Sequence, residues 1–374
     1  MKRTLIVATT SWAGMGPYVS EIVNTFSPKD GVYFLLHDYE DDFYRKNVKE
    51  DLLPNCIFHK KANSNWNKLK NLFLFDSEFY NLIIETCKKY NIEQVHSINH
   101  PVHKSVAKRL HREGYVTIGT VHDLHPHEAR KAPHKMFRHW LYNRQDLGGM
   151  AFNDALVTNS MLQYAELQQM FPNGNVYFHA FPSLVTPIIK EGKMVPEELK
   201  NLDKPYILFF GRIEEYKGVK YLYDAFVSNS QLSENYCLVI AGKGEISFER
   251  NANEKNVIWM SRYIDDKEVK YLYENAKCVV YPYISATQSG VLSLAFFFQT
   301  PVLASDVPFF KSSIEPSGAG LTFRVGDTTH LTEQLLRLLN SDLQTIKNAE
   351  LDYYNSFYIG ESIHDKLIEI YSSL

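Results

Sequence analysis

Short apolar runs rich in β-branched and aromatic residues recur along the chain, with segments of helical pattern between them. Runs such as RTLIVATT (3–10) and YILFFGR (206–212) do not alternate polar and apolar residues, so we expect strands that are buried on both faces. Such strands form parallel sheets covered by helices, and strand–helix alternation is the α/β pattern. The other predicted strands lie at 31–38, 93–98, 116–123, 155–160, 176–181, 237–244, 257–263, 278–283, 301–306 and 320–325.

The pattern breaks once, at 188–205. This segment, IIKEGKMVPEELKNLDKP, is charged, contains two prolines and has no clear strand. A chain of 374 residues has room for about two domains, so we predict a linker here between two doubly wound domains. The tail at 356–374 predicts an amphipathic helix whose apolar face is made by Ile363, Leu367, Ile370 and Tyr371.

Charge and cysteine content restrict the class of partner and the compartment. A net charge of −3 argues against a nucleic-acid partner for the whole chain. The four cysteines form no CxxC pair, which favours buried free thiols in a reducing compartment. No signal peptide is evident, and no apolar run approaches the ~20 residues of a membrane span. We therefore expect a cytoplasmic protein, or one that is peripheral on the inner face of the membrane.

The loop SATQSG (285–290) joins a predicted strand to a helix that starts near Val291. Helix N-termini offer unpaired N–H groups, and Gly290 allows a ligand to approach the backbone closely. Small hydroxyl side chains can cap the helix or donate to an oxygen, and the loop holds no carboxylate that would repel an anion. The pattern therefore fits a neutral phosphate cradle, although an ordinary N-cap loop remains the alternative.

A second loop of interest is GRIEEYKG (211–218), which follows the strand YILFF. Arg212 and Lys217 both suit phosphate oxygens, one as a planar fork of donors and the other as a compact charge. The alternative is two solvated cations paired with Glu214 and Glu215. In the N-terminal loop, Gly14 and Gly16 precede a helix and could form another backbone cradle, which alone is a weak signal.

The segment VHDLHPHE (121–128) places three histidines after a predicted strand. A zinc site is disfavoured because the histidines do not share a helix face and no cysteine stands nearby. The favoured interpretation is that one histidine among His122, His125 and His127 points into a cleft and that the other two lie at the surface.

Taken in order, these segments resemble the retaining family 4 glycosyltransferases (glycosyl transferases group 1), which have the GT-B fold. The resemblance rests mainly on GRIEEYKGVKYLYDAF, LVIAGKGE, NVIWMSRYIDDKEVKYLYENAKCVVYPY and PVLASDVPFF. It implies two Rossmann-like domains that face an interdomain cleft, with a C-terminal helix that crosses back to the first domain. The domains predicted in this way are 1–188 plus 356–374, on the acceptor side, and 189–355, which binds the nucleotide-sugar.

The resemblance also implies roles for particular residues. Arg212 and Lys217 would hold the donor diphosphate, and His122 would face the donor sugar. The implied donor-binding set is Gly14, Gly16, Arg262, Tyr263, Thr287, Gln288, Ser289, Gly290 and Val291, with Arg262 and Tyr263 near the nucleobase. Many members carry two glutamates across the 285–295 region, whereas this chain carries Thr287 and Ala295 in their place.

The implied reaction transfers a sugar from a nucleotide-diphosphate donor to a glycan or lipid-linked acceptor, with retention and with no metal or other cofactor. A UDP-sugar is expected rather than a GDP-sugar, and surface polysaccharide or glycolipid synthesis is the expected role. Basic and aromatic residues at 56–75 and 128–145 suit an anionic membrane surface, or else form a solvated helix face. Two alternatives are a non-hydrolysing nucleotide-sugar epimerase and a nucleotide-sugar-binding protein without activity.

Overall fold

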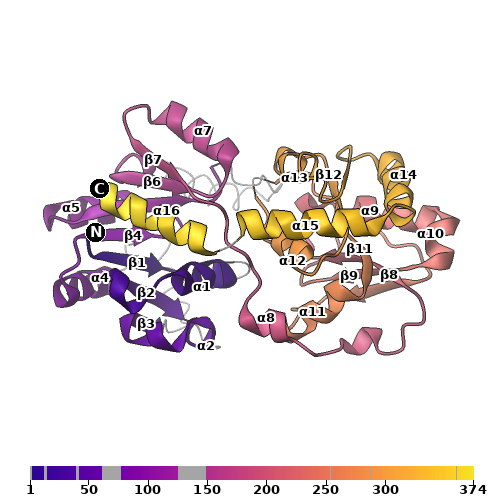
Figure 1. The fold of residues 1–374 in the computed structure, drawn as a ribbon, viewed down its shortest axis with the longest axis horizontal. Helices are drawn as coiled ribbons and strands as arrows, with labels where there is room; N and C mark the ends of the chain where they lie inside the picture. The colour runs from indigo at the N-terminus through magenta and orange to yellow at the C-terminus, as the bar shows by residue number, and fades with distance from the viewer. Residues whose placement is uncertain are drawn as a thin grey trace. The chain divides into compact units, whose positions relative to one another are not determined.

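The computed structural model describes residues 2–11, 15–38, 42–60, 77–124, 149–252, 254–286, 288–358 and 360–374. The chain forms two compact units. The first comprises Met1–Pro182 with Gly360–Leu374, and the second comprises Ser183–Ile359. Each unit is an α/β layer structure with its own parallel sheet (Figure 1).

In its described residues, the first unit has a seven-stranded parallel sheet of order β3-β2-β1-β4-β5-β6-β7. Its strands are β1 (Thr4–Ala8), β2 (Val32–Asp38), β3 (Cys56–Lys60), β4 (Gln94–Ser97), β5 (Val116–Val121), β6 (Ala155–Thr158) and β7 (Asn175–Phe178). Its helices are α1 (Met15–Thr25), α2 (Phe43–Asn47), α4 (Ser77–Tyr90), α5 (Lys104–Arg112), α7 (Met161–Met170) and α16 (Gly360–Ser373), with 3-10 helices η1 (Pro28–Asp30) and η2 (Glu50–Asn55). The strand order reverses between β1 and β4, as in doubly wound sheets.

The second unit has a six-stranded parallel sheet of order β10-β9-β8-β11-β12-β13 in its described residues. Its strands are β8 (Tyr206–Phe210), β9 (Cys237–Ala241), β10 (Val257–Met260), β11 (Ala276–Tyr281), β12 (Val302–Ser305) and β13 (Leu321–Phe323). Its helices are α8 (Pro187–Glu191), α9 (Val219–Ser228), α10 (Ser230–Asn235), α11 (Asp266–Glu274), α12 (Val291–Phe297), α13 (Pro308–Ile314), α14 (Thr328–Leu339) and α15 (Leu343–Phe357), with 3-10 helices η3 (Glu197–Leu199) and η4 (Glu215–Lys217).

Every predicted strand is present, which confirms the α/β prediction. Sequence reasoning missed β3, whose residues are mostly half-buried, because an edge strand of this kind has no long apolar run. The segment 188–205, predicted as a linker, instead contributes to α8 and η3 and lies within the second unit. One of its two prolines, Pro196, is the N-cap of η3, and Pro187, directly before the segment, is the first residue of α8.

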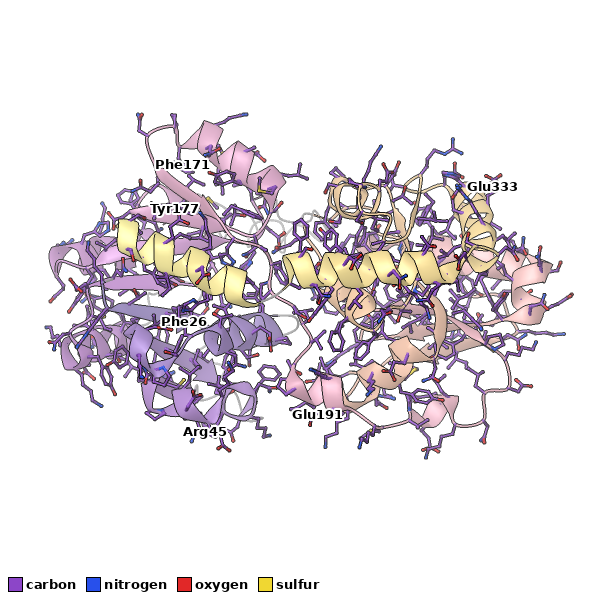
Figure 2. All side chains as sticks on the ribbon, viewed as in Figure 1. Phe26, Arg45, Phe171, Tyr177, Glu191 and Glu333 are labelled. Atoms are coloured by element: carbon purple, nitrogen blue, oxygen red, sulfur yellow. The ribbon has the colours of Figure 1, made fainter. Side chains whose placement is uncertain are left out.

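The C-terminal helix α16 packs beside α1 over the first sheet (Figure 1). Its predicted apolar face is confirmed, because Ile363, Leu367, Ile370 and Tyr371 are at most 1% exposed. Phe26, labelled in Figure 2, stacks its ring 6.4 Å from that of Tyr371. The helix therefore completes the core of the first unit.

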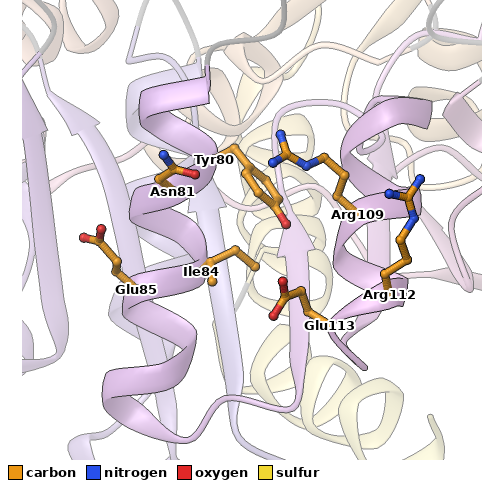
Figure 3. A pocket seen from close by; sticks show the side chains of 7 residues that line it. All are labelled: Tyr80, Asn81, Ile84, Glu85, Arg109, Arg112 and Glu113. Carbon is orange, nitrogen blue, oxygen red and sulfur yellow. The ribbon is translucent and has the colours of Figure 1, made fainter.

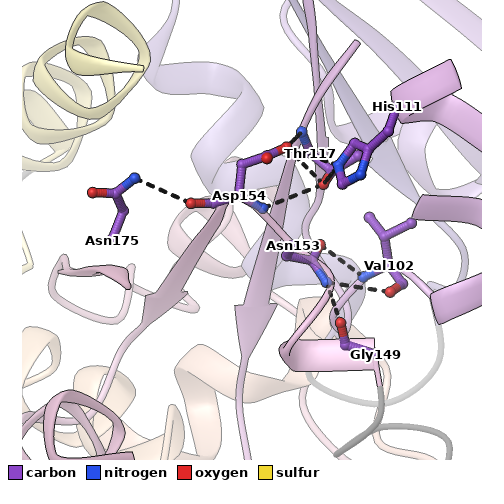
Figure 4. Close-up of polar contacts among 7 residues, drawn as sticks. All are labelled: Val102, His111, Thr117, Gly149, Asn153, Asp154 and Asn175. Carbon is purple, nitrogen blue, oxygen red and sulfur yellow. Dashed lines mark hydrogen bonds and ion pairs between the residues drawn. The ribbon is translucent and has the colours of Figure 1, made fainter. Parts of the chain in front are cut away.

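Hydrogen bonds near the amino ends of β5 and β6 fix that edge of the first sheet (Figure 4). Asp154 Oδ2 accepts from Thr117 N at 2.7 Å and lies 2.9 Å from His111 Nε2. Asn153 Nδ2 donates to the carbonyls of Val102 and Gly149. Polar side chains at this edge are used for structure, and the opposite, carboxyl edge is where a ligand is expected.

Candidate functional site

In the second sheet, the strand order reverses between β8 and β11. Ligands of open α/β sheets bind beyond the carboxyl ends of the strands at such a switch point. The two loops that leave these strands are GRIEEYKG (211–218) and the loop that leads to α12, and both were singled out from the sequence.

The loop after β8 lies backbone to backbone against the loop after β9. Gly211 N donates to Ala241 O at 3.0 Å, and Ile213 N donates to Lys243 O at 3.0 Å. Gly242 has φ of 150°, and a Cβ there would lie 1.9 Å from Gly211 O. Only glycine permits this approach, so the GKG pattern fixes the path of the loop that carries the two cations.

The same loop also packs against the segment that follows β11. Gly218 has φ of 64°, and a Cβ there would lie 1.9 Å from Pro282 O. Ile284 N donates to Tyr216 O at 2.8 Å. These contacts hold Lys217 close to the strand end that leads into α12.

Lys217 lies between two tyrosine rings. Its Nζ is 3.7 Å from the ring centroid of Tyr283 and 4.8 Å from that of Tyr216. Withdrawal from water lowers the pKa of Lys217, and the nearby Tyr216 opposes that shift. The cation is therefore partly desolvated and held by aromatic faces.

Arg212 has a different environment. Its side chain is 57% exposed, and Nη1 forms an ion pair with Glu214 Oε1 at 2.7 Å. The alternative of a solvated, paired cation thus describes Arg212 in the structure. Lys217, by contrast, makes no ion pair in the part of the chain that the structure describes.

The start of α12 faces the same aromatic ring. Ser289 is buried, and its hydroxyl lies 3.4 Å from Tyr283 Oη, a long contact. The first turn of α12 is closed by short-range hydrogen bonds, because Leu292 N donates to Ser289 O at 3.3 Å and Ser293 N donates to Gly290 O at 3.1 Å. Lys217 and Ser289 therefore both contact Tyr283, one at its ring face and the other at its hydroxyl.

The expected side-chain cap of α12 is not present in the described residues. The N-cap is Gly290, and it makes no side-chain cap hydrogen bond. Ser289 contacts Tyr283 instead, and Gln288 is half-buried beside it. Thr287 lies outside the described residues.

Two buried hydroxyls brace the first turn of α12 from within. Ser293 Oγ donates to Gly290 O at 2.6 Å, and Tyr281 Oη donates to Val291 O at 3.1 Å. Ala295, which stands where many family members have a glutamate, is fully buried and cannot reach a ligand. Sequence reasoning missed Tyr281, Tyr283 and Ser293, and only the aromatic residues of YPY (281–283), at the end of β11, could have signalled two of them.

Arg262, after β10, is fully engaged within the protein. Its guanidinium binds Glu198 through Nε and Nη2, at 2.8 and 2.9 Å, and binds Glu268 through Nη1 and Nη2, at 2.7 and 2.8 Å. Nη1 also donates to Tyr263 O at 3.2 Å. All five N–H donors have partners, so Arg262 shapes this loop rather than donating to a ligand. The side chain of Tyr263 is 67% exposed on the same loop.

In the first unit, His122 follows β5. Its Nε2 lies 2.9 Å from Ile98 O, so Nε2 carries the proton and donates it. The ring of Tyr18 meets that of His122 edge-on at 4.7 Å. Burial lowers the pKa of His122, so its imidazole is neutral near pH 7.

A network of neutral side chains surrounds this histidine. Tyr18 Oη donates to Asn159 Oδ1 at 3.0 Å, and Asn159 Nδ2 donates to His179 O at 3.2 Å. His96 lies 2.7 Å from Tyr371 Oη and 2.9 Å from Thr120 Oγ1. Burial lowers the pKa of His96 to about 3 and that of His179 to about 4.

Gly16 is not part of a loop. It is the second residue of α1, and a Cβ there would lie 2.8 Å from both Phe43 Cε1 and Ser11 O. Glycine at this position permits close packing of α1 on its neighbours. Gly14 lies outside the described residues.

The hollows in the described residues include two of interest for ligand binding. The larger, of about 360 Å³, lies between α4 and α5 and is lined by Tyr80, Asn81, Ile84, Glu85, Arg109, Arg112 and Glu113 (Figure 3). Its charges are mixed, and Glu113 is 3.6 Å from Lys88, so it offers no uniform charge to a ligand. The smaller, of about 190 Å³, is lined in part by Ile213, Tyr221, Phe248 and Ile284 and adjoins the loop that carries Lys217.

The remaining sequence predictions concern metals and membranes. Among the described residues, no group of three His, Cys, Asp or Glu side chains could hold a metal ion. No described helix is both long and apolar enough to span a membrane. His125, His127 and most of the stretches 56–75 and 128–145 lie outside the described residues.

Residues 191–355 match the family described as Glycosyl transferases group 1. No curated protein has a sequence that matches this chain significantly. Among solved structures, sucrose-phosphate synthase from Thermosynechococcus elongatus is similar, with a TM-score of 0.71 and 16% identity over 100% of this chain and 99% of that chain.

Two further solved structures are similar over the same length. Anabaena HepE in complex with UDP and glucose has a TM-score of 0.68 and 13% identity over 100% of both chains. A glycosyltransferase from Rickettsia africae ESF-5 has a TM-score of 0.65 and 16% identity, over 100% of this chain and 98% of that chain. Together with the two parallel sheets, these similarities show that the fold is GT-B, as predicted.

Proposed function

We propose that this protein is a glycosyltransferase that uses a nucleotide-diphosphate sugar and holds the diphosphate at the carboxyl ends of β8 and β11. The observation that carries the proposal is that Lys217 and Ser289, from the loops after β8 and β11, both contact Tyr283. This site lies within the segment that matches the glycosyltransferase group 1 family. The UDP in the HepE structure supports UDP as the nucleotide.

The geometry suits stabilisation of a leaving group. When the bond between the anomeric carbon and the diphosphate breaks, negative charge grows on the phosphate oxygens. The Lys217 ammonium and the Arg212 guanidinium supply positive charge where that charge develops. The acceptor oxygen bonds the anomeric carbon on the same face, and its proton goes to the departing diphosphate.

The finer features follow from the resemblance. We infer retention, family 4 membership and a reaction without a metal or other cofactor. His122 is assigned to the donor sugar, and its neutral imidazole fits hydrogen bonding better than electrostatic attraction. The acceptor is a glycan or a lipid-linked sugar, and an anionic membrane surface is the partner proposed for the basic stretches.

A panel of UDP- and GDP-sugars, with and without candidate acceptors, tests the proposal. Acceptor-dependent release of the nucleoside diphosphate is the expected result. Conversion of the free nucleotide-sugar into its epimer would instead establish an epimerase. Thermal stabilisation by a nucleotide-sugar without turnover would instead indicate a binding protein without activity. This alternative is motivated by Thr287 and Ala295, which stand where many family members have glutamates.

A further inference from the structure

Lys217 is held differently from the neighbouring cations. Arg212 pairs with Glu214, and Lys220 pairs with Asp224. In the described residues Lys217 makes no such pair, and its ammonium lies 3.7 Å from the ring centroid of Tyr283. An aromatic face therefore occupies the place that a carboxylate would usually take.

The ring of Tyr283 is a fixed platform. The residue is fully buried, and its ring meets Phe310 at 5.1 Å and Tyr281 at 5.9 Å, both in T-shaped contacts. Its carbonyl accepts a hydrogen bond of 2.6 Å from Ser305 Oγ on the neighbouring strand. Because the ring is enclosed, it cannot turn away from Lys217 without disturbing the core.

We propose that Tyr283 is a positioning residue of the diphosphate site, whose ring face holds the Lys217 ammonium at the carboxyl end of β11 without cancelling its charge. The inference rests on the proposed function. A carboxylate in this position would neutralise the lysine and repel the incoming phosphate. The ring quadrupole attracts the cation and carries no net charge, so no ion pair has to break when the diphosphate binds.

Tyr283 also reaches the other half of the site. Its hydroxyl lies 3.4 Å from the hydroxyl of Ser289, directly before the N-cap of α12. One buried side chain thus contacts both the cation and the start of the helix. Substitutions can separate these contacts, because phenylalanine keeps the ring and loses only the hydroxyl.

The first test uses the protein without nucleotide. Lysine is labelled with ¹³C at Cε, and the Lys217 signal is assigned from its loss in Lys217→Arg. We expect the Hε protons of Lys217 to be shifted upfield by the ring current of Tyr283, in the wild type and in Tyr283→Phe. The shift should fall sharply in Tyr283→Leu, to the smaller contribution of the Tyr216 ring at 4.8 Å, with Tyr283→Met as the substitute if the leucine variant does not fold. A Lys217 signal that is unchanged in the aliphatic variant overturns the proposal.

The second test is a double-mutant cycle on binding of UDP, with GDP in parallel, measured by calorimetry. Tyr283→Leu should weaken binding about 3- to 30-fold, the range expected for a partly desolvated cation–π contact. The same change should have little further effect in a Lys217→Ala background, whereas two independent contributions would multiply. Additive losses contradict the positioning role.

Tyr206 provides the matched control. It is a buried tyrosine at the opposite end of β8, whose hydroxyl donates to Leu272 O at 2.8 Å. Tyr206→Leu should lower stability without moving the Lys217 signal. If the wild type binds neither nucleotide, the proposed function fails, while the ring-current test still decides whether Tyr283 holds Lys217.

Discussion

The two sheets have the same doubly wound plan, yet their carboxyl edges are built from different chemistry. At the first edge, the side chains of Tyr18, Asn159 and His179 bond to one another and stay neutral. At the second edge, the Lys217 ammonium lies against the ring of Tyr283 and makes no ion pair in the described residues. The named side chains of the first edge therefore pair with one another, whereas the second edge keeps a cation available for a ligand.

The comparison teaches that burial has opposite uses at the two edges. Burial keeps His96 and His179 uncharged and makes them part of the core. Lys217 is withdrawn from water as well, but two tyrosine rings stabilise its charged form. Changes at the first edge should thus alter stability, and changes at the second should alter binding and turnover.

Acid should produce the largest difference between the units. His96 and His179 have folded pKa values of about 3 and about 4, below the ordinary 6.5, so their stabilising effect is present above pH 6.5 and is lost as pH falls toward those values. At pH 4.5 the loss amounts to about 5 kcal/mol, at ~1.4 kcal/mol for each unit of pKa per histidine. Hydrogen exchange read by mass spectrometry should show the first unit opening first.

One buried acid of the second unit should respond in the opposite sense. Glu350 is fully buried, neither of its oxygens has a hydrogen-bond partner of good geometry in the described residues, and burial raises its pKa well above the ordinary value. The contribution of Glu350 to folding stability is fully present below the pKa of the unfolded state and is lost as the pH rises. Acid therefore does not destabilise the second unit through this residue. His179→Gln should flatten the pH dependence of the first unit alone, and an unchanged slope would contradict the assignment.

The next largest effect is expected from Lys217→Ala. Loss of a donor at a developing negative charge typically costs ~3–4 kcal/mol, so kcat/KM should fall roughly 10²–10³-fold while the protein stays folded. Lys220→Ala is the matched control, because Lys220 is exposed and pairs with Asp224 on the next turn of α9. Near-normal turnover of Lys217→Ala would rule out its role at the leaving group.

A smaller effect is expected from Asn159→Ala at the first edge. The change leaves the buried hydroxyl of Tyr18 without its acceptor, which costs about 1–3 kcal/mol of unfolding free energy. Binding of UDP by the second unit should be unaffected. The control is Gln168→Ala, which removes an exposed amide–tyrosine bond of 2.8 Å to Tyr164 and should change stability by less than about 0.5 kcal/mol. If both variants lose the same free energy of unfolding, the buried network contributes no more to stability than an exposed hydrogen bond.

The sequence predicted the strands well because buried parallel strands have long apolar runs that local reading can recognise. It also identified Lys217 and the loop before α12, since glycines and cations at strand ends are local features. It did not predict Tyr283 as the residue that joins them, because that contact depends on how β8 and β11 pair across about 70 residues of sequence. Nor did it predict that the guanidinium of Arg262 forms hydrogen bonds with Glu198, because the two residues lie far apart in the chain.

The finest comparison is between the two cations of the second edge. Arg212 is mostly exposed and paired with Glu214, whereas Lys217 lies against the Tyr283 ring and makes no ion pair in the described residues. Exposed ion pairs contribute little, so Glu214→Gln should change stability by less than about 1 kcal/mol. It should also free the guanidinium and tighten UDP binding about 2- to 5-fold at low salt, an effect that high salt screens. Glu215→Gln, which removes an exposed acid that makes no ion pair in the described residues, is the control. If both variants tighten binding equally, long-range charge rather than release of Arg212 is responsible.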